Sequence, residues 1–201
     1  MRNDGGVTVL EDGYLPDSVG QAKDKFVVLS GCSGGGKSSL LSALAARGHR
    51  VFAEPGRQVI REQNCIGGDA TPEQDVLKFL DFTISRTMHH MISAASTHAV
   101  AFFDRSIVDQ VGGFERMGME IPTHLQRAVE LFRYHRRVFI TPPWPEIFRN
   151  DTERRHSFED AVANYESQMK TYERFGYELV FVPKLAVEDR ADFVLTMLSL
   201  I

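Results

Sequence analysis

Residues 31–38 read Gly-Cys-Ser-Gly-Gly-Gly-Lys-Ser and match the pattern G-x-x-x-x-G-K-[ST] at every fixed position. This stretch directly follows the apolar run 26–29 and leads into the helix-favouring run 39–46. A strand before the glycines and a helix after them is the context in which this pattern forms a phosphate-binding loop. The stretch therefore predicts nucleotide binding, and the alternative is an ordinary glycine-rich turn.

The residue types in this loop suit a triphosphate. Glycines let successive backbone N–H groups converge on phosphate oxygens, and the following helix adds the positive end of its dipole. Lys37 would reach the β- and γ-phosphates, and the Ser38 hydroxyl would bind Mg²⁺. The residues that we expect to contact the nucleotide are Gly31, Ser33, Gly34, Gly35, Gly36, Lys37, Ser38, Ser39 and, in the loop after the last strand, Pro183.

Five short apolar runs follow one another at helix-length intervals, and they predict buried parallel strands at 26–29, 51–53, 99–103, 138–140 and 179–182. Amphipathic patterns fill the intervals between several of them. Strands that alternate with helices predict an α/β fold, here a three-layer α/β/α P-loop NTPase fold with a mainly parallel five-stranded sheet. The glycine-rich segment 1–24 has no sustained period, so we expect a flexible N-terminal arm before one domain over 25–201.

The overall composition narrows the class of protein. The chain has 201 residues, 43% of them apolar and 25% charged, with a formal net charge of −4, which argues against a nonspecific nucleic-acid binder. Two cysteines cannot build a disulfide framework or a four-ligand zinc site. No apolar run approaches the roughly 18 residues of a membrane span. We therefore expect a cytoplasmic protein with neither nucleic acid nor membrane as a partner.

Two acidic residues follow predicted strands at the edge where open α/β sheets bind ligands. Asp104 ends a wholly apolar strand and would hold Mg²⁺, although it could instead belong to a helix cap with Ser106 and Asp109. Glu54 would accept a proton from an attacking hydroxyl, and the alternative is an acid that only begins the turn at Pro55. Ser38 and Asp104 are thus the expected metal ligands.

Two groups of arginines are candidates for binding anions. Arg57 and Arg61 lie one helical turn apart and would meet an anionic substrate group, unless they form a solvated basic face. Residues 149–158, after the Pro-rich exit of the fourth strand, are predicted to form a lid. In it Arg154 and Arg155 would close on the transferring phosphate, with Arg149 behind them. An exposed charged turn is the alternative.

The ordered combination of motifs resembles the small AAA-domain NTPases, a group related to the ribosylnicotinamide kinase module of bacterial NAD-regulator proteins. The signatures are the phosphate loop, Asp104-Arg105 with Asp109, Pro142-Pro143, Asp151 with Arg154, Tyr172, Gly176-Tyr177 and Val182-Pro183. A weaker resemblance to deoxynucleoside kinases rests on Glu54-Pro55 and the acid-Arg-Ser triplet 104–106. It implies that Glu54 is the base and that Arg105 contacts the reacting end of the substrate, with ATP as the phosphate donor.

The sequence thus predicts a Mg-ATP-dependent kinase of a small hydroxylated metabolite, such as a nucleoside or a nucleotide precursor. The residues expected to act in catalysis are Lys37, Glu54, Asp104, Arg105, Arg154 and Arg155. Those expected to bind the acceptor are Glu54, Arg57 and Arg105. Two alternatives remain open, which are a nucleotide-gated binding protein and an NTPase that hydrolyses without an acceptor.

Overall fold

The computed structural model describes residues 14–149 and 157–201. Within these ranges five parallel strands form one sheet in the order β2-β3-β1-β4-β5. They are β1 (Phe26–Gly31), β2 (Arg50–Phe52), β3 (Ala101–Asp104), β4 (Arg137–Thr141) and β5 (Glu178–Phe181). Each strand coincides with one of the apolar runs, so the predicted fold class is confirmed.

Helices connect the strands, as the amphipathic patterns predict. The α-helices are α1 (Val19–Ala22), α2 (Lys37–Ala46), α3 (Pro55–Ile66), α4 (Val76–Ala95), α5 (Ile107–Arg116), α6 (Thr123–Leu131), α7 (Phe158–Arg174) and α8 (Val187–Met197). Short 3-10 turns occur at η2 (Pro16–Ser18), η3 (Lys23–Lys25) and η4 (Pro145–Ile147). Of the helices in the described part of the chain, none combines the length and apolar character needed to cross a membrane.

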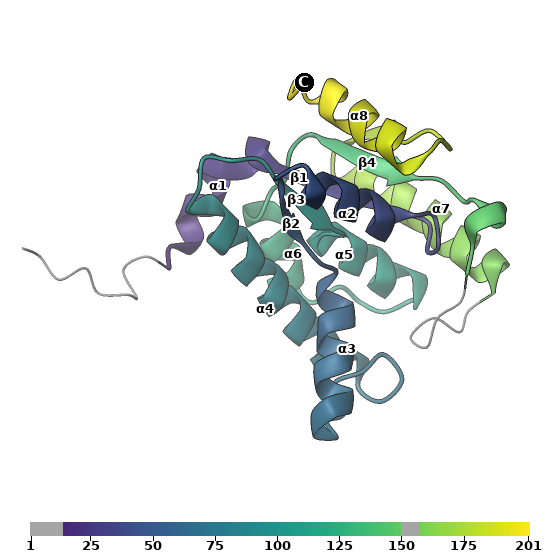
Figure 1. Ribbon diagram of the computed structural model, residues 1–201. Helices are drawn as coiled ribbons and strands as arrows, with labels where there is room; N and C mark the ends of the chain where they lie inside the picture. Colours follow the sequence, from purple (N-terminus) through teal and green to yellow (C-terminus); the bar gives the residue numbers. More distant parts are fainter. Residues whose placement is uncertain (1–13, 150–156) are drawn as a thin grey trace, which may run out of the picture.

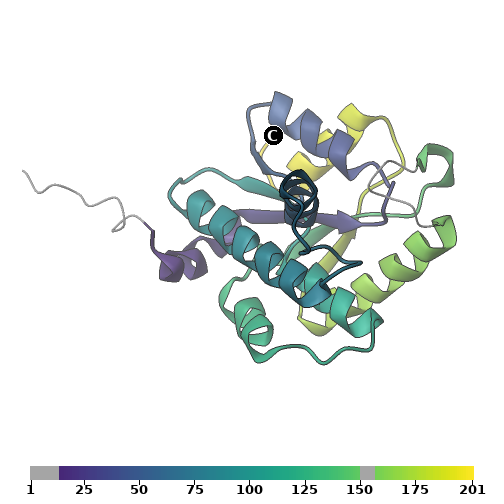
Figure 2. The same cartoon turned by 90° about the horizontal axis from the view of Figure 1, so that it is seen from below.

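The sheet is the middle of three layers because successive side chains of a strand point to opposite faces. In β1, Val27 and Leu29 pack with residues of α2 and α8 on one face. Phe26 and Val28 pack with residues of α4, α5, α6 and α7 on the other face. Figure 2 shows the two sets of helices on opposite sides of β1, while α3 extends away from the sheet (Figure 1).

Part of the predicted N-terminal arm packs onto the domain. Residues 16–25 form the turns η2, α1 and η3, and Val19 and Ala22 are buried in the same core cluster as α4. The prediction of a flexible arm over 1–24 is therefore wrong for its last part. These two apolar side chains lie one helical turn apart, and together they anchor the segment.

Candidate active site

The phosphate-loop sequence connects β1 to α2 and packs tightly against the end of β4. The Cys32 amide donates to the carbonyl oxygen of Thr141 at 2.9 Å. Gly31 has a φ of 117°, and a Cβ there would lie 2.3 Å from that same oxygen. Only glycine fits this approach, so the first glycine of the motif fixes how the loop leaves the sheet.

Lys37 begins α2, and its ammonium group lies over the loop. Its side chain is only 4% exposed, and Nζ donates to the carbonyl oxygens of Cys32 at 3.2 Å and Gly31 at 3.5 Å. Lys37 also interacts electrostatically with Asp104 and opposes the rise of that carboxyl's pKa. Its position over the loop suits the contact with phosphate oxygens predicted for this lysine.

Asp104 ends β3, beside Leu29 of β1 in the sheet register. It is 7% exposed, and among the described residues no group bonds to its Oδ1 atom. Burial raises the pKa of Asp104 to about 6, Lys37 opposes this rise, and Glu54 adds to it. The alternative role predicted for Asp104 is a helix cap. Ser106 and Asp109 form the capping box of α5 without it.

An unpaired buried carboxylate oxygen fits a divalent cation. Asp104 borders the same cavity as the exposed Ser38 hydroxyl, and hydroxyl and carboxylate oxygens are hard ligands of the kind Mg²⁺ prefers. No cluster of three or more His, Cys, Asp or Glu residues in the described ranges could hold a metal by itself. Mg²⁺ usually takes only one or two protein carboxylates, and waters and substrate phosphates fill the remaining positions.

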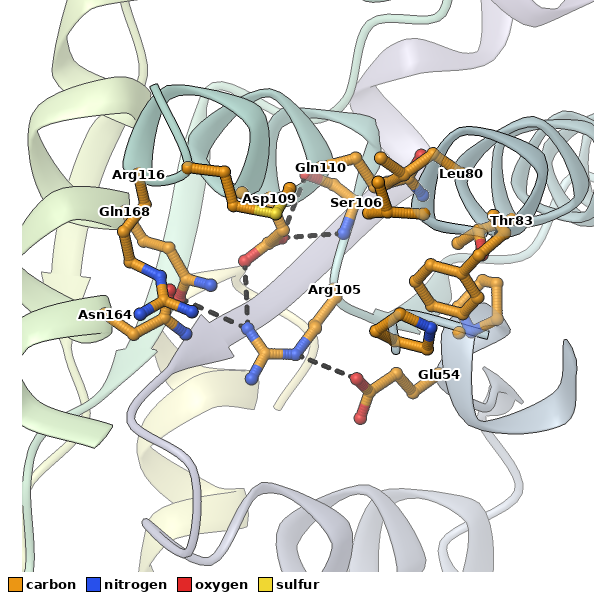
Figure 3. Close-up of a pocket in the computed structure, with 17 residues that line it drawn as sticks. Glu54, Leu80, Thr83, Arg105, Ser106, Asp109, Gln110, Arg116, Asn164 and Gln168 are labelled. Atoms are coloured by element: carbon orange, nitrogen blue, oxygen red, sulfur yellow. Dashed lines mark hydrogen bonds and ion pairs between the residues drawn. The ribbon is translucent and has the colours of Figure 1, made fainter. Parts of the chain in front are cut away.

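Arg105 connects the ends of two neighbouring strands to the helix layer. Its Nε atom lies 3.2 Å from Glu54, and its Nη1 atom lies 3.3 Å from Asp109 and 3.2 Å from Gln168 (Figure 3). The backbone φ of Arg105 is 68°, a left-handed conformation that costs a side-chain-bearing residue about 1–3 kcal/mol. The fold therefore accepts local strain to place this guanidinium beside Glu54.

Asp109, on α5, holds Arg105 in place. It is 7% exposed and accepts hydrogen bonds from the hydroxyls of Ser30 at 2.5 Å, Tyr172 at 2.5 Å and Ser106 at 3.2 Å. These bonds tie α5 to β1 and α7, and they hold Arg105 through the same carboxylate. Sequence reasoning foresaw Asp109 as a helix cap but missed Ser30, which reads as an ordinary strand residue.

Glu54 borders two cavities of the described structure. The first, of about 290 Å³, has Phe79 and Leu80 of α4 on one wall and Gln110 and Gln168 among its polar groups. The second, of about 300 Å³, is lined by residues of the predicted metal and anion sites, which are Ser38, Asp104, Arg57 and Arg61. A carboxylate between a substrate-sized cavity and the predicted phosphate site can exchange a proton with a group in either one.

The three residues predicted to bind the acceptor do not all line the same cavity. Glu54 and Arg105 line the first cavity. Arg57 lines the second cavity, where its Nε atom approaches the other Glu54 oxygen at 3.3 Å. Pro183 follows β5 and accepts a hydrogen bond from the Leu185 amide at 3.0 Å. The lid candidates Arg154 and Arg155 lie outside the described residues.

Comparison with known proteins identifies the family. The family model described as AAA domain matches residues 26–190. The chain belongs to this AAA domain family. No curated protein matches this AAA domain chain significantly in sequence.

Two kinases are among the solved structures similar to this AAA domain. Deoxyadenosine kinase from M. mycoides, with dCMP and dCDP bound as products, matches with a TM-score of 0.59 and 15% identity over 88% of this chain and 100% of that one. Thymidylate kinase from Ehrlichia chaffeensis matches with a TM-score of 0.55 and 15% identity over 88% of this chain and 98% of that one. At this identity the likeness establishes a shared P-loop kinase fold.

Proposed function

We propose that this AAA domain protein is a Mg-ATP-dependent kinase that phosphorylates a small hydroxylated metabolite. The observation that carries the proposal is the position of Glu54. It lies between a cavity of about 290 Å³ and the groove that contains Ser38 and Asp104, and it is ion-paired with Arg105. The fold shared with deoxyadenosine and thymidylate kinases supports this assignment.

The donor side of the reaction belongs to the phosphate loop. Backbone amides of the phosphate loop cradle the triphosphate of ATP, and Lys37 contacts its β- and γ-phosphates. Ser38 and Asp104 would hold Mg²⁺, which neutralises the charge of the phosphate oxygens when it is bound. The proposed closure of Arg154 and Arg155 over the transferring group rests on the sequence alone.

On the acceptor side, Glu54 is the general base. Its carboxylate accepts the proton of the acceptor hydroxyl as the oxygen attacks the γ-phosphate of ATP, and ADP leaves. Arg105 and Arg57 hold the two oxygens of this carboxylate at 3.2 and 3.3 Å. They orient it and stabilise its ionised form, so that the enzyme contributes positioning and charge neutralisation.

The lining of the first cavity supports a nucleoside or nucleotide precursor as the acceptor. Phe79 offers an apolar ring surface, and Gln110 offers an unpaired amide oxygen, Oε1. The hydroxyl of Thr87 donates its proton to the Thr83 carbonyl oxygen at 2.7 Å. Toward Gln110 this hydroxyl can therefore only accept, so the amide nitrogen of Gln110 faces Thr87. An N–H or O–H donor of the acceptor, such as a heterocyclic base carries, would complete the bonding of the Gln110 oxygen.

A metabolite screen tests the proposal. Purified protein is incubated with Mg-ATP and individual nucleosides, nucleotide precursors including ribosylnicotinamide, and other hydroxylated metabolites. ADP release is measured alongside the mass of the product. We expect release that depends on one class of acceptor and a product one phosphoryl group heavier. Slow ATP hydrolysis at the same rate with every compound would contradict the kinase assignment and favour a nucleotide-gated protein.

A further inference from the structure

Arg190 is a buried cation beside the phosphate loop. It lies in the first turns of α8, is 5% exposed, and donates from Nη1 to the carbonyl oxygen of Gly36 at 3.3 Å. Its guanidinium carbon lies 5.5 Å from the centre of the Trp144 ring. No sequence pattern drew attention to Arg190, because it lies outside every motif and only the folded chain brings it to the loop.

This guanidinium has no counter-charge in the described part of the protein. Its Nε atom is buried without a hydrogen-bond partner, and none of the described carboxylates pairs with it. Of the acids on α8, Glu188 and Asp192 pair with Arg47 instead, and the neighbouring Asp189 is exposed. Burial lowers the pKa of Arg190, yet an arginine stays protonated at neutral pH. A buried charge of this kind is costly unless an anion joins it.

The contact with Gly36 places this charge next to the predicted phosphate site. Gly36 has a φ of 81°, and a Cβ at this position would lie 2.7 Å from the Nη1 atom of Arg190. A side chain here would displace the guanidinium from the loop. Glycine at position 36 thus allows both the turn of the loop and the close approach of Arg190.

We propose that Arg190 binds the phosphate groups of the donor nucleotide. Its Nη1 atom donates to the Gly36 carbonyl, and the guanidinium donates to a phosphate oxygen when a nucleoside di- or triphosphate enters the loop. The C-terminal helix therefore contributes to the donor site, in addition to the loop and Lys37. This inference rests on the proposed function, since it requires that the loop binds nucleotides.

The experiment compares Arg190→Met with Arg133→Met. Arg133 makes the same two kinds of contact, a bond to the Phe175 carbonyl at 2.9 Å and a cation–π contact with Tyr177 at 4.4 Å. It lies just before β4, at the opposite edge of the sheet from the loop. Calorimetry measures the affinity of each variant and of the wild type for Mg-ATP, Mg-ADP and magnesium tripolyphosphate, a probe that has phosphates but no base or ribose.

We expect Arg190→Met to weaken binding of all three ligands at least about tenfold, the worth of a charged hydrogen bond. Arg133→Met should leave the affinities unchanged, and Arg190→Lys should restore part of them. The nucleotide-free Arg190→Met protein should unfold at the same or a higher temperature than the wild type, because it no longer buries an uncompensated charge.

Different outcomes overturn different claims. Wild-type affinity in Arg190→Met, combined with a lower unfolding temperature, would make Arg190 a structural clamp and overturn the inference. A loss for ATP without a loss for tripolyphosphate would assign Arg190 to the base or ribose and overturn it as well. If the wild type binds none of the three ligands, the proposed function fails, and this inference fails with it.

Discussion

The Nε atom of Arg105 lies 3.2 Å from the Oε1 atom of Glu54. The two residues follow β3 and β2, which are neighbours in the sheet, so the parallel arrangement brings their ends together. Both residues line the proposed acceptor cavity, and Glu54 also lines the groove that contains the predicted metal ligands. The proposed chemistry therefore depends on how these two side chains hold each other.

Replacement of Glu54 tests the proposed general base. Glu54→Gln keeps the shape of the side chain but removes the proton acceptor, so kcat should fall by about 10²- to 10⁴-fold. The affinity for Mg-ATP should change by less than about threefold, since uncharged replacements near the loop leave the amide contacts intact. Steady-state rates with the acceptor found in the screen and calorimetry with ATP give the two numbers.

Glu62→Gln is the matched control for Glu54. Glu62 lies on α3, the helix that begins directly after Glu54, and pairs with Arg86 at 2.8 Å, but it borders neither of the two cavities described above. Its replacement should leave kcat unchanged. Equal losses of kcat and of ATP affinity in Glu54→Gln would show that Glu54 holds the site together and does not accept the proton.

Gln110 is expected to select the acceptor. Gln110→Leu removes the unpaired Oε1 atom and should raise the KM for the acceptor about tenfold, the worth of one buried hydrogen bond. The affinity for ATP should not change. Gln126→Leu serves as the control, because its amide is exposed and bonds to the Ile121 carbonyl. An unchanged KM in Gln110→Leu would place the acceptor outside this cavity.

Much of the site was predictable because its parts are local in sequence. The glycines and Lys37 form one continuous motif, and Asp104 and Glu54 follow apolar runs that became neighbouring strands. The contacts of Arg190 were not predictable. Its bond to Gly36 joins residues 154 positions apart, and neither hydropathy nor spacing signals such a pair.

The separation of Arg57 from Arg105 was likewise beyond the sequence. Both residues contact Glu54, but Arg57 approaches its Oε2 atom and Arg105 its Oε1 atom. Arg105 also has a left-handed backbone, with a φ of 68°, and lines the first cavity. A left-handed arginine has no sequence signature, because glycine and asparagine are the residues that normally occupy this conformation.

Asp104→Asn should stabilise the nucleotide-free protein. The pKa of Asp104 is raised from 3.8 to about 6, so at pH 8 the folded state holds a carboxylate that would be more stable in water. Removal of its charge should raise the free energy of unfolding by about 3 kcal/mol at pH 8, and by less at pH 5, where the wild-type carboxyl is already protonated in the folded state. Urea denaturation at both values measures the difference.

The same variant should lose its response to magnesium. Mg-ATP should raise the unfolding temperature of the wild type more than ATP with a chelator does, and this additional rise should vanish in Asp104→Asn. If the variant is less stable at pH 8, or responds to Mg²⁺ as the wild type does, then Asp104 is a structural residue.

His90 should lower the free energy of unfolding in acid. Burial, helped by the charges of Arg86 and His89, lowers the pKa of His90 from 6.5 to about 4. The folded state thus keeps His90 neutral between these values while the unfolded state takes up a proton, so this contribution to stability falls as the pH drops from 6.5 to 4. The loss should reach at most about 3 kcal/mol.

His90→Phe isolates this effect. The phenyl ring keeps the packing against Phe52, whose ring centre lies 5.0 Å from that of His90, and it cannot be protonated. Free energies of unfolding measured from pH 7 to pH 4 should fall less steeply in this variant than in the wild type. Identical slopes for His90→Phe and the wild type would refute the assignment.

The central claim is that the amides of the loop and Lys37 hold the triphosphate of a nucleotide together with magnesium. Isothermal titration calorimetry of wild-type and Lys37→Ala protein with ATP, with and without Mg²⁺, tests it most directly. The account predicts saturable binding to the wild type that strengthens when magnesium is added, and a loss of at least about tenfold in Lys37→Ala. Absence of magnesium-dependent binding in folded wild-type protein, or equal affinities of the two proteins, would contradict it.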